Sequence, residues 1–132
     1  MAEPVALISS ERITQQDFAT ALTAIGAVID PSDAAKARFS SGDMHVWLFR
    51  RDEELSTFER PVMELITRGL GGAPQTCIII EISRRPGSES LALEVACAFA
   101  SRWPCVVYDL GREVYTKQEL AVLRQSGKGF SE

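Results

Sequence analysis

The chain has 132 residues and a net charge of −4, from 18 acidic and 14 basic side chains. Its length suits one domain with one hydrophobic core, and 45% apolar with 24% charged residues exclude the composition of a disordered chain. The acidic balance argues against direct binding to nucleic acid, which depends mainly on cationic side chains. We therefore expect one globular domain over residues 1–132.

Short apolar runs and the number of cysteines favour an intracellular protein. The run Cys77–Ile80 is far below the roughly 20 residues that cross a bilayer, and the N-terminus lacks the basic and apolar regions of a signal peptide. We therefore expect a cytoplasmic protein with no membrane partner. Cys77, Cys97 and Cys105 lie in apolar segments and are odd in number, which indicates reduced core residues and not a disulfide framework.

The N-terminal third combines one strand with one helix. Residues 5–8 form a short apolar run that predicts a strand. Thr14 is a suitable N-cap for a helix whose apolar residues recur every three or four positions up to Val28, and Asp30-Pro31 should end it. The polar residues 32–43 predict a turn region.

Residues 44–49 are the clearest strand of the first half. Both alternating sets of side chains are largely apolar, so we expect this strand to be covered on both faces. After the acidic residues 52–54, Val62, Leu65 and Ile66 predict a helix that ends at the glycines of residues 69–72.

The C-terminal half contains two further strands and two further helices. Residues 76–83 are almost continuously apolar and rich in β-branched side chains, which predicts a central strand. Residues 89–102 predict a helix that is apolar on nearly all sides, and residues 105–108 predict another buried strand. The capping box from Thr116 to Glu119 starts a final short helix, and residues 126–132 should fray.

The order of these elements predicts the fold class. Strand, helix, strand, helix and strand follow one another between residues 44 and 108, and the connections are long enough for crossover helices. We therefore expect a single α/β domain with a small, mostly parallel sheet of about four strands and helices packed on it. The placement of the first strand stays open, because it could join the sheet in either direction or only cover it.

Catalytic and cofactor chemistry finds little support in these residues. His45 is the only histidine, and its position inside a strand favours a structural role over that of a general base. The cysteines and His45 lack the spacing of a zinc site, and the glycines of residues 69–72 and 126–129 match no phosphate-binding loop. We therefore expect no catalytic residue, no metal and no cofactor.

Two groups of polar residues are candidate binding sites. Ligands of open α/β sheets bind at the carboxyl ends of the strands, which predicts an alternative ligand edge. This edge consists of Glu81, Arg84, Ser88, Tyr108 and Asp109. A local excess of carboxylates could instead steer a basic protein partner. This acidic patch consists of Asp52, Glu53, Glu54 and Glu59. For the ligand edge, the competing interpretation is that Glu81 forms a structural ion pair. For the acidic patch, it is that the carboxylates are only a solvated surface.

The segment from Leu91 to Leu120 carries a pattern of packing residues that begins with Leu-Ala-Leu-Glu-Val-Ala and continues through Trp103-Pro104 and Val114-Tyr115-Thr116. This pattern resembles that of small bacterial immunity proteins of polymorphic or secreted toxin systems. The resemblance implies an acidic single domain, without activity of its own, that binds and neutralises a cognate toxin.

Three hypotheses for the function follow. The first is a non-enzymatic binding protein of the immunity type, whose partner is a toxin domain. The second is a small-ligand-binding or enzymatic domain that uses the edge at Glu81 and Asp109. The third is an adaptor or structural subunit, and none of the three defines an oligomeric state.

Overall fold

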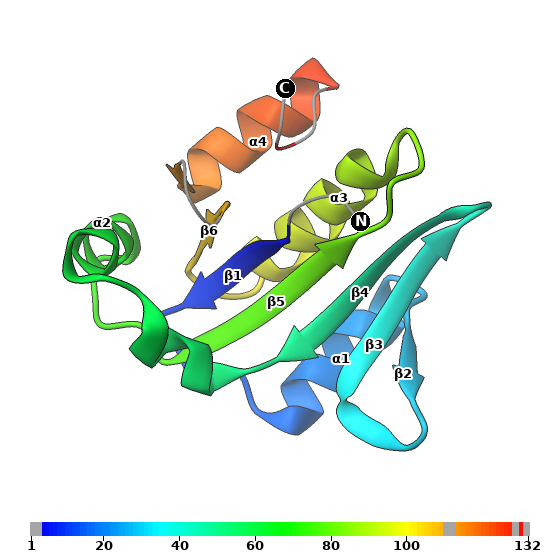
Figure 1. Ribbon diagram of the computed structural model, residues 1–132, viewed down its shortest axis with the longest axis horizontal. Coiled ribbons are helices and arrows are strands. Elements are labelled where there is room, and N and C mark those ends of the chain that lie inside the picture. Colours follow the sequence, from blue (N-terminus) through cyan, green and yellow to red (C-terminus); the bar gives the residue numbers. More distant parts are fainter. Residues whose placement is uncertain (1–3, 110–112, 128–129, 131–132) are drawn as a thin grey trace.

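The computed structural model describes residues 4–109, 113–127 and 130 of the chain (Figure 1). Within these residues, the strands are β1 (Val5–Ser9), β2 (Val28–Asp30), β3 (Asp33–Ser41), β4 (Met44–Arg50), β5 (Thr76–Ile82), β6 (Cys105–Tyr108) and β7 (Val114–Tyr115). The helices are α1 (Gln15–Ala24), α2 (Arg60–Leu70), α3 (Ser88–Ala100), α4 (Lys117–Ser126) and the short 3-10 helix η1 (Asp52–Thr57).

One sheet contains all of these strands, in the order β2-β3-β4-β5-β1-β6-β7. Every pair of neighbouring strands is antiparallel. The prediction of a small, mostly parallel sheet of about four strands is therefore wrong. The strands and helices do form a single α/β domain.

The position of β1 explains one part of this error. β1 lies between β5 and β6 and pairs antiparallel with both, so that Leu7 is opposite Ile78 on one side and Val107 on the other. β5 and β6 consequently run in the same direction, but they are not neighbours. A crossover helix such as α3 permits two parallel strands without requiring that they be adjacent.

The other predicted parallel pair, β4 and β5, is antiparallel and adjacent. Arg50, the last residue of β4, is opposite Ile78, close to the start of β5. The segment with η1 and α2 therefore leaves and re-enters the sheet at the same end. Such a connection makes an antiparallel pair, although it is long enough for a crossover.

Two strands, β2 and β3, lie where the sequence predicted a helix end and a turn region. α1 ends at Ala24, earlier than predicted, and the chain then forms the meander β2-β3-β4. In β3, Ala37 and Phe39 point to the core, whereas Lys36 and Arg38 lie on the other face. This strand is covered on one face only, and its polar composition therefore resembles that of a loop.

The first face of the sheet carries the main hydrophobic core. α1, α3 and α4 contribute to it, and Val46, Leu48 and Ile80 contribute from the sheet. The rings of Phe18 on α1 and Phe99 on α3 lie 6.3 Å apart, centroid to centroid. α3 is apolar nearly all round, as predicted, because it packs against the sheet and also against α4.

The second face carries a smaller core. α2 packs on β6 and β7, and η1 packs on β5. Ile8, Ile66 and Ile79 are buried between these elements. Figure 1 shows this face toward the viewer, with α1 and α3 behind the sheet and α2 at one side. The helices of this face leave β2, β3 and the part of β4 around Trp47 uncovered, whereas Phe49 packs at the margin of the smaller core.

The predicted helix starts at Thr14 and Thr116 are confirmed. Each threonine side chain accepts the backbone N–H three residues later, in a capping box. The predicted fraying of residues 126–132 falls partly outside the described residues. Within them, Phe130 is buried and its carbonyl oxygen accepts a hydrogen bond of 3.1 Å from the Tyr115 hydroxyl. None of the described helices is long and apolar enough to cross a membrane.

Candidate functional site

The uncovered part of the second sheet face is the most distinctive surface of the described chain. The prediction that β4 is covered on both faces is wrong, because Val46 and Leu48 are buried whereas Trp47 and Phe49 are only half-buried. Cross-strand pairing places the outward side chains of β2 to β5 in rows. We call this surface the open face and define it by Val28, Lys36, Arg38, Trp47, Phe49 and Glu81.

Trp47 lies at the centre of the open face. Its cross-strand neighbours are Arg38 on β3 and Glu81 on β5, and Val28 on β2 continues the row beyond Arg38. The indole ring stands 5.9 Å from the ring of His45, centroid to centroid. Trp47 belongs to neither hydrophobic core. A large aromatic side chain here leaves apolar area available for contact with another molecule.

Phe49 holds two cationic side chains against the sheet. The Nζ atom of Lys36 lies 5.5 Å from the centroid of the Phe49 ring, and the guanidinium carbon of Arg51 lies 4.9 Å from it. These cation–π contacts favour positions in which both charges remain close to the open face. The aromatic residues and the cations therefore form one continuous surface.

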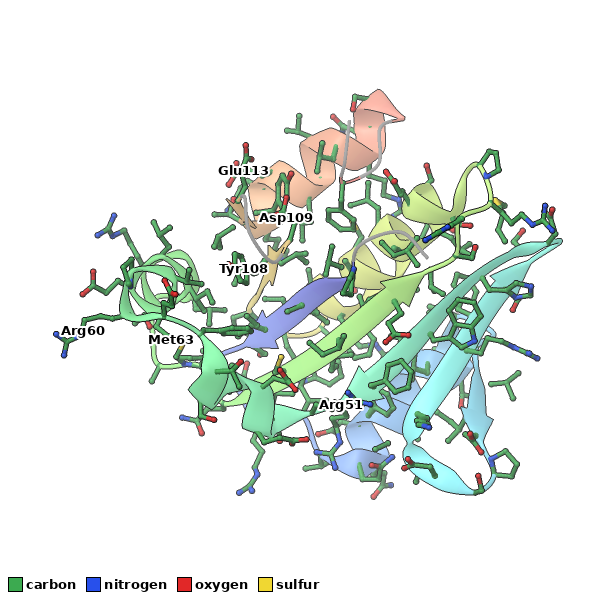
Figure 2. All side chains as sticks on the ribbon, viewed as in Figure 1. Arg51, Arg60, Met63, Tyr108, Asp109 and Glu113 are labelled. Carbon is green, nitrogen blue, oxygen red and sulfur yellow. The ribbon has the colours of Figure 1, made fainter. Side chains whose placement is uncertain are left out.

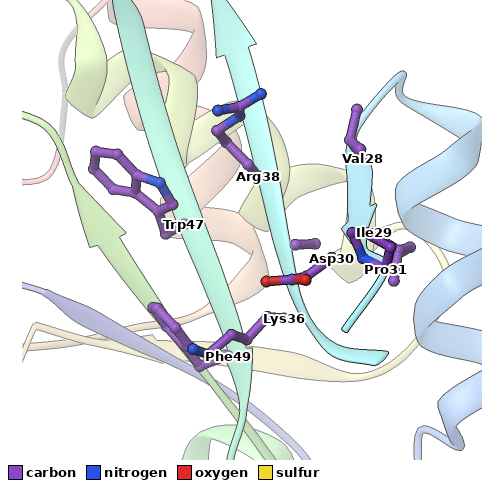
Figure 3. Close-up of a pocket in the computed structure, with 9 residues that line it drawn as sticks. Val28, Ile29, Asp30, Pro31, Lys36, Arg38, Trp47 and Phe49 are labelled. Carbon is purple, nitrogen blue, oxygen red and sulfur yellow. The ribbon is translucent and has the colours of Figure 1, made fainter. Parts of the chain in front are cut away.

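A pocket of about 390 Å³ opens on this surface (Figure 3). Figure 3 shows the rings of Trp47 and Phe49 on one side of it and Val28 and Pro31 on the other, with charged side chains between them. Ligand pockets typically combine apolar walls with a few polar groups that fix orientation. The pocket is therefore a feature in which a side chain of another molecule could be held.

Cations outnumber carboxylates among the residues of the open face, its pocket and the Phe49 ring contacts, although the chain carries a net charge of −4. On the open face itself the cations are Lys36 and Arg38 and the carboxylate is Glu81, while Arg51 stands over the Phe49 ring and Asp30 lines the pocket. Asp30 accepts the backbone N–H and the hydroxyl of Ser32, both at 2.8 Å. These hydrogen bonds lower the pKa of Asp30. The Asp30 carboxylate is thus engaged in the turn after β2, which leaves Glu81 as the opposing charge beside Trp47.

The structure divides the acidic patch predicted from the sequence. Asp52 is half-buried, and its Oδ1 atom accepts the N–H of Cys77 at 3.1 Å while its Oδ2 atom lies 3.8 Å from Nη1 of Arg50. Glu53 and Glu59 are exposed and Glu54 is half-buried, all on or just after η1. Asp52 is therefore engaged in contacts within the fold, and Glu53 and Glu59 are the exposed carboxylates of the patch.

The alternative ligand edge does not form one pocket in the described chain. Arg84 lines a hollow of about 420 Å³ with Asp43, and Ser88 is buried against the hydroxyl of Ser83. Tyr108 and Asp109 lie at β6, which is separated from β5 by β1 (Figure 2).

The remaining residues of that edge have partners within the fold. The Tyr108 ring packs edge-on against Phe58, with centroids 5.5 Å apart. Asp109 is buried, and its Oδ1 atom accepts the N–H of Glu113 at 2.9 Å. Glu81 lies on the open face, opposite Trp47. The edge therefore separates into a part beside β4 and a part beside β6.

His45 and Ser40 form the pair that most resembles a catalytic arrangement. The Ser40 hydroxyl lies 2.7 Å from Nδ1 of His45. A nucleophile and base of this kind need a third group that orients the imidazole. In the part of the chain that the structure describes, no carboxylate bonds to the Nε2 atom of His45, and no group of three potential metal ligands occurs.

The residues of the open face were not identified as a site from the sequence. The alternation of Lys36, Arg38 and Ser40 with Ala37 and Phe39 was the signal that could have revealed it. That period of two predicts a strand with one polar face. Beside β4, such a strand places cations next to Trp47.

These features define a class only broadly: a single antiparallel α/β domain with an aromatic and cationic sheet surface that no helix of the described chain covers. Comparisons with protein-family models, with curated proteins and with solved structures gave no match to this chain. The resemblance of residues 91–120 to immunity proteins therefore remains an expectation from the sequence.

Proposed function

We propose that this protein is a non-enzymatic binding protein that recognises another protein through the open face. The observation that carries the proposal is the pair of Trp47 and Arg38 on adjacent strands, half-buried and exposed respectively, at the wall of a pocket. Tryptophan and arginine are the residue types that most often dominate binding energy in protein interfaces. A sheet also holds them with little loss of conformational freedom on binding.

A toxin domain is the partner that we propose to test first. The segment that resembles immunity proteins, residues 91–120, forms α3, β6, β7 and the start of α4. Leu93 and Leu120 of this segment lie in the main core, and Val106 lies in the smaller core. The resemblance therefore concerns the scaffold, and none of the residues that define the open face belongs to this segment. A contact surface separate from the shared scaffold would allow different partners on one fold.

Co-expression with the product of the neighbouring gene tests this function. We expect the wild-type chain to restore growth of cells that produce that protein, and to co-purify with it. Trp47→Ala should abolish protection and raise the Kd at least about thirtyfold, as expected for loss of a dominant interface residue.

The matched control is Val122→Ala, because Val122 is an exposed apolar residue on α4, away from the open face. This variant should protect as well as the wild type. Loss of protection by Val122→Ala and retention by Trp47→Ala would contradict the open face as the contact surface. A wild-type chain that neither protects nor co-purifies would contradict the toxin domain as partner.

A further inference from the structure

The charges around Trp47 indicate which chemistry the partner presents. We infer that the open face binds an acidic protein segment that carries an apolar side chain, with that side chain in the pocket and its carboxylates beside Arg38, Lys36 and Arg51. This inference deepens the proposed function and rests on the open face being the contact surface. The partner charge inferred here is negative, whereas the acidic patch predicted from the sequence would attract a positively charged partner.

The positions of the cations support an anionic partner. Arg38 is exposed directly beside Trp47, and no carboxylate of the described chain lies within 4 Å of its guanidinium group. Lys36 and Arg51 stand over the ring of Phe49. Three cations thus border one aromatic surface, and a guanidinium group binds a carboxylate in a bidentate manner.

The pocket indicates that the partner segment carries an apolar side chain. Trp47, Phe49, Val28 and Pro31 supply its apolar walls, and the volume of about 390 Å³ is sufficient for a leucine or aromatic side chain. An anchor of this kind becomes desolvated at the centre of an interface, whereas carboxylates at the rim select the partner and speed its association.

The carboxylates on the open face favour a protein segment over a nucleic acid. Glu81 lies directly opposite Trp47, and Asp30 lines the same pocket. A strand of nucleic acid would bring a phosphate charge to every nucleotide beside these two groups, in a chain with a net charge of −4. A peptide can instead place a backbone N–H at Glu81 and its carboxylates at the cations.

Titration of the full-length chain with three probes tests the inference by NMR. The probes are a blocked peptide of glutamates with one central leucine, the same peptide with lysines in place of glutamates, and an oligothymidylate of equal length. We expect saturable shifts of the Trp47 indole N–H and of β3 and β4 amides with the acidic peptide alone. Raising the salt concentration should weaken this binding.

Charge variants make the test specific. Lys36→Glu combined with Arg38→Glu should raise the Kd for the acidic peptide at least tenfold, whereas Glu53→Lys combined with Glu59→Lys should not raise it. Glu81→Gln removes the opposing charge and should lower the Kd about twofold to fivefold. A gain of affinity cannot arise from misfolding, so this variant keeps the inference testable if the first pair is unstable.

Results with the other two probes also test the inference. Preferential binding of the lysine peptide or of the oligothymidylate at Trp47 would overturn the acidic-segment inference and leave the open face as the contact surface. Absence of saturable shifts with every probe would also overturn it. The proposed function fails separately, if the co-expressed partner binds equally well to the wild type and to Trp47→Ala.

Discussion

Asp52 links the end of β4 to the start of β5. It accepts the backbone N–H of Cys77 and lies near Arg50. Removing an acceptor from a buried backbone donor typically costs about 1–3 kcal/mol, because the donor loses its partner without regaining water. We therefore expect Asp52→Ala to lower the free energy of unfolding by about that amount, as measured by chemical denaturation.

Glu53→Ala is the matched control for this prediction. Glu53 lies next to Asp52 on η1, but its side chain is exposed. Exposed substitutions of this kind usually change stability by less than about 0.5 kcal/mol. Equal losses in both variants would show that the contact of Asp52 with Cys77 does not stabilise the fold.

Two buried thiols predict a loss of stability at alkaline pH. Burial raises the pKa of Cys77 to about 12 and that of Cys105 to about 12, because a thiolate loses its hydration in the core. An unfolded thiol ionises near pH 9, whereas the folded one stays protonated. Stability is thus fully present below about pH 9 and is lost as the pH rises toward 12, by at most about 1.4 kcal/mol per pH unit for each thiol.

Denaturation curves between pH 8 and pH 11 measure this dependence. Cys105→Ala should be less stable than the wild type at pH 8, because it leaves a cavity, but should lose less stability between pH 9 and pH 11. Identical pH slopes in the two proteins would contradict the prediction. A thiol reagent at pH 8 should modify Cys97 before the other two, because Cys97 is half-buried while Cys77 and Cys105 are buried.

At the scale of elements, the sequence was most informative where local physics decides the structure. The capping threonines, the strand at residues 76–82 and the helix at residues 88–100 are all present where side-chain chemistry and hydrophobic period predicted them. The starts and ends of these helices and strands depend on contacts between residues that are close in the sequence. Such contacts leave a direct pattern in the sequence.

β3 shows where this approach failed. Its residues are small or polar at every position except Phe39, and its pairing with β4 accounts for their strand conformation. The open face is not predicted, for the same reason. Without β2 and β3 beside β4, the aromatic side chains of Trp47 and Phe49 predict that this strand is buried on both faces. β-propensity depends on cross-strand neighbours, which a single segment does not reveal.

At the scale of the whole molecule, strand order was beyond the sequence because hydrophobic period contains no information on direction. β1 and β5 are buried on both faces, so their composition suits a parallel or an antiparallel sheet equally well. Insertion of β1 between β5 and β6 is a long-range choice. The sequence does not predict where β1 joins the sheet. Its insertion separates β5 from β6 and makes both of its own pairings antiparallel.

The same architecture predicts a gradient of stability across the sheet. β1 and β5 lie at its centre between the two hydrophobic cores, whereas β2 and β3 lie at one edge with one face uncovered. Backbone amides with few buried apolar contacts exchange through local opening, and central amides exchange only through global unfolding. We therefore expect amide hydrogen exchange of β5 to report the full free energy of unfolding.

β2 and the adjoining part of β3 should exchange with an opening free energy several kcal/mol lower, because only the main core supports them. Protection of β3 and β4 should rise when the open face is occupied, whereas protection of α2 should not change. Hydrogen exchange followed by NMR, with and without the acidic peptide, measures both effects. Equal protection of β2 and β5 in the free protein would contradict the gradient, because it would require a single cooperative unit in which the uncovered edge is as well supported as the centre.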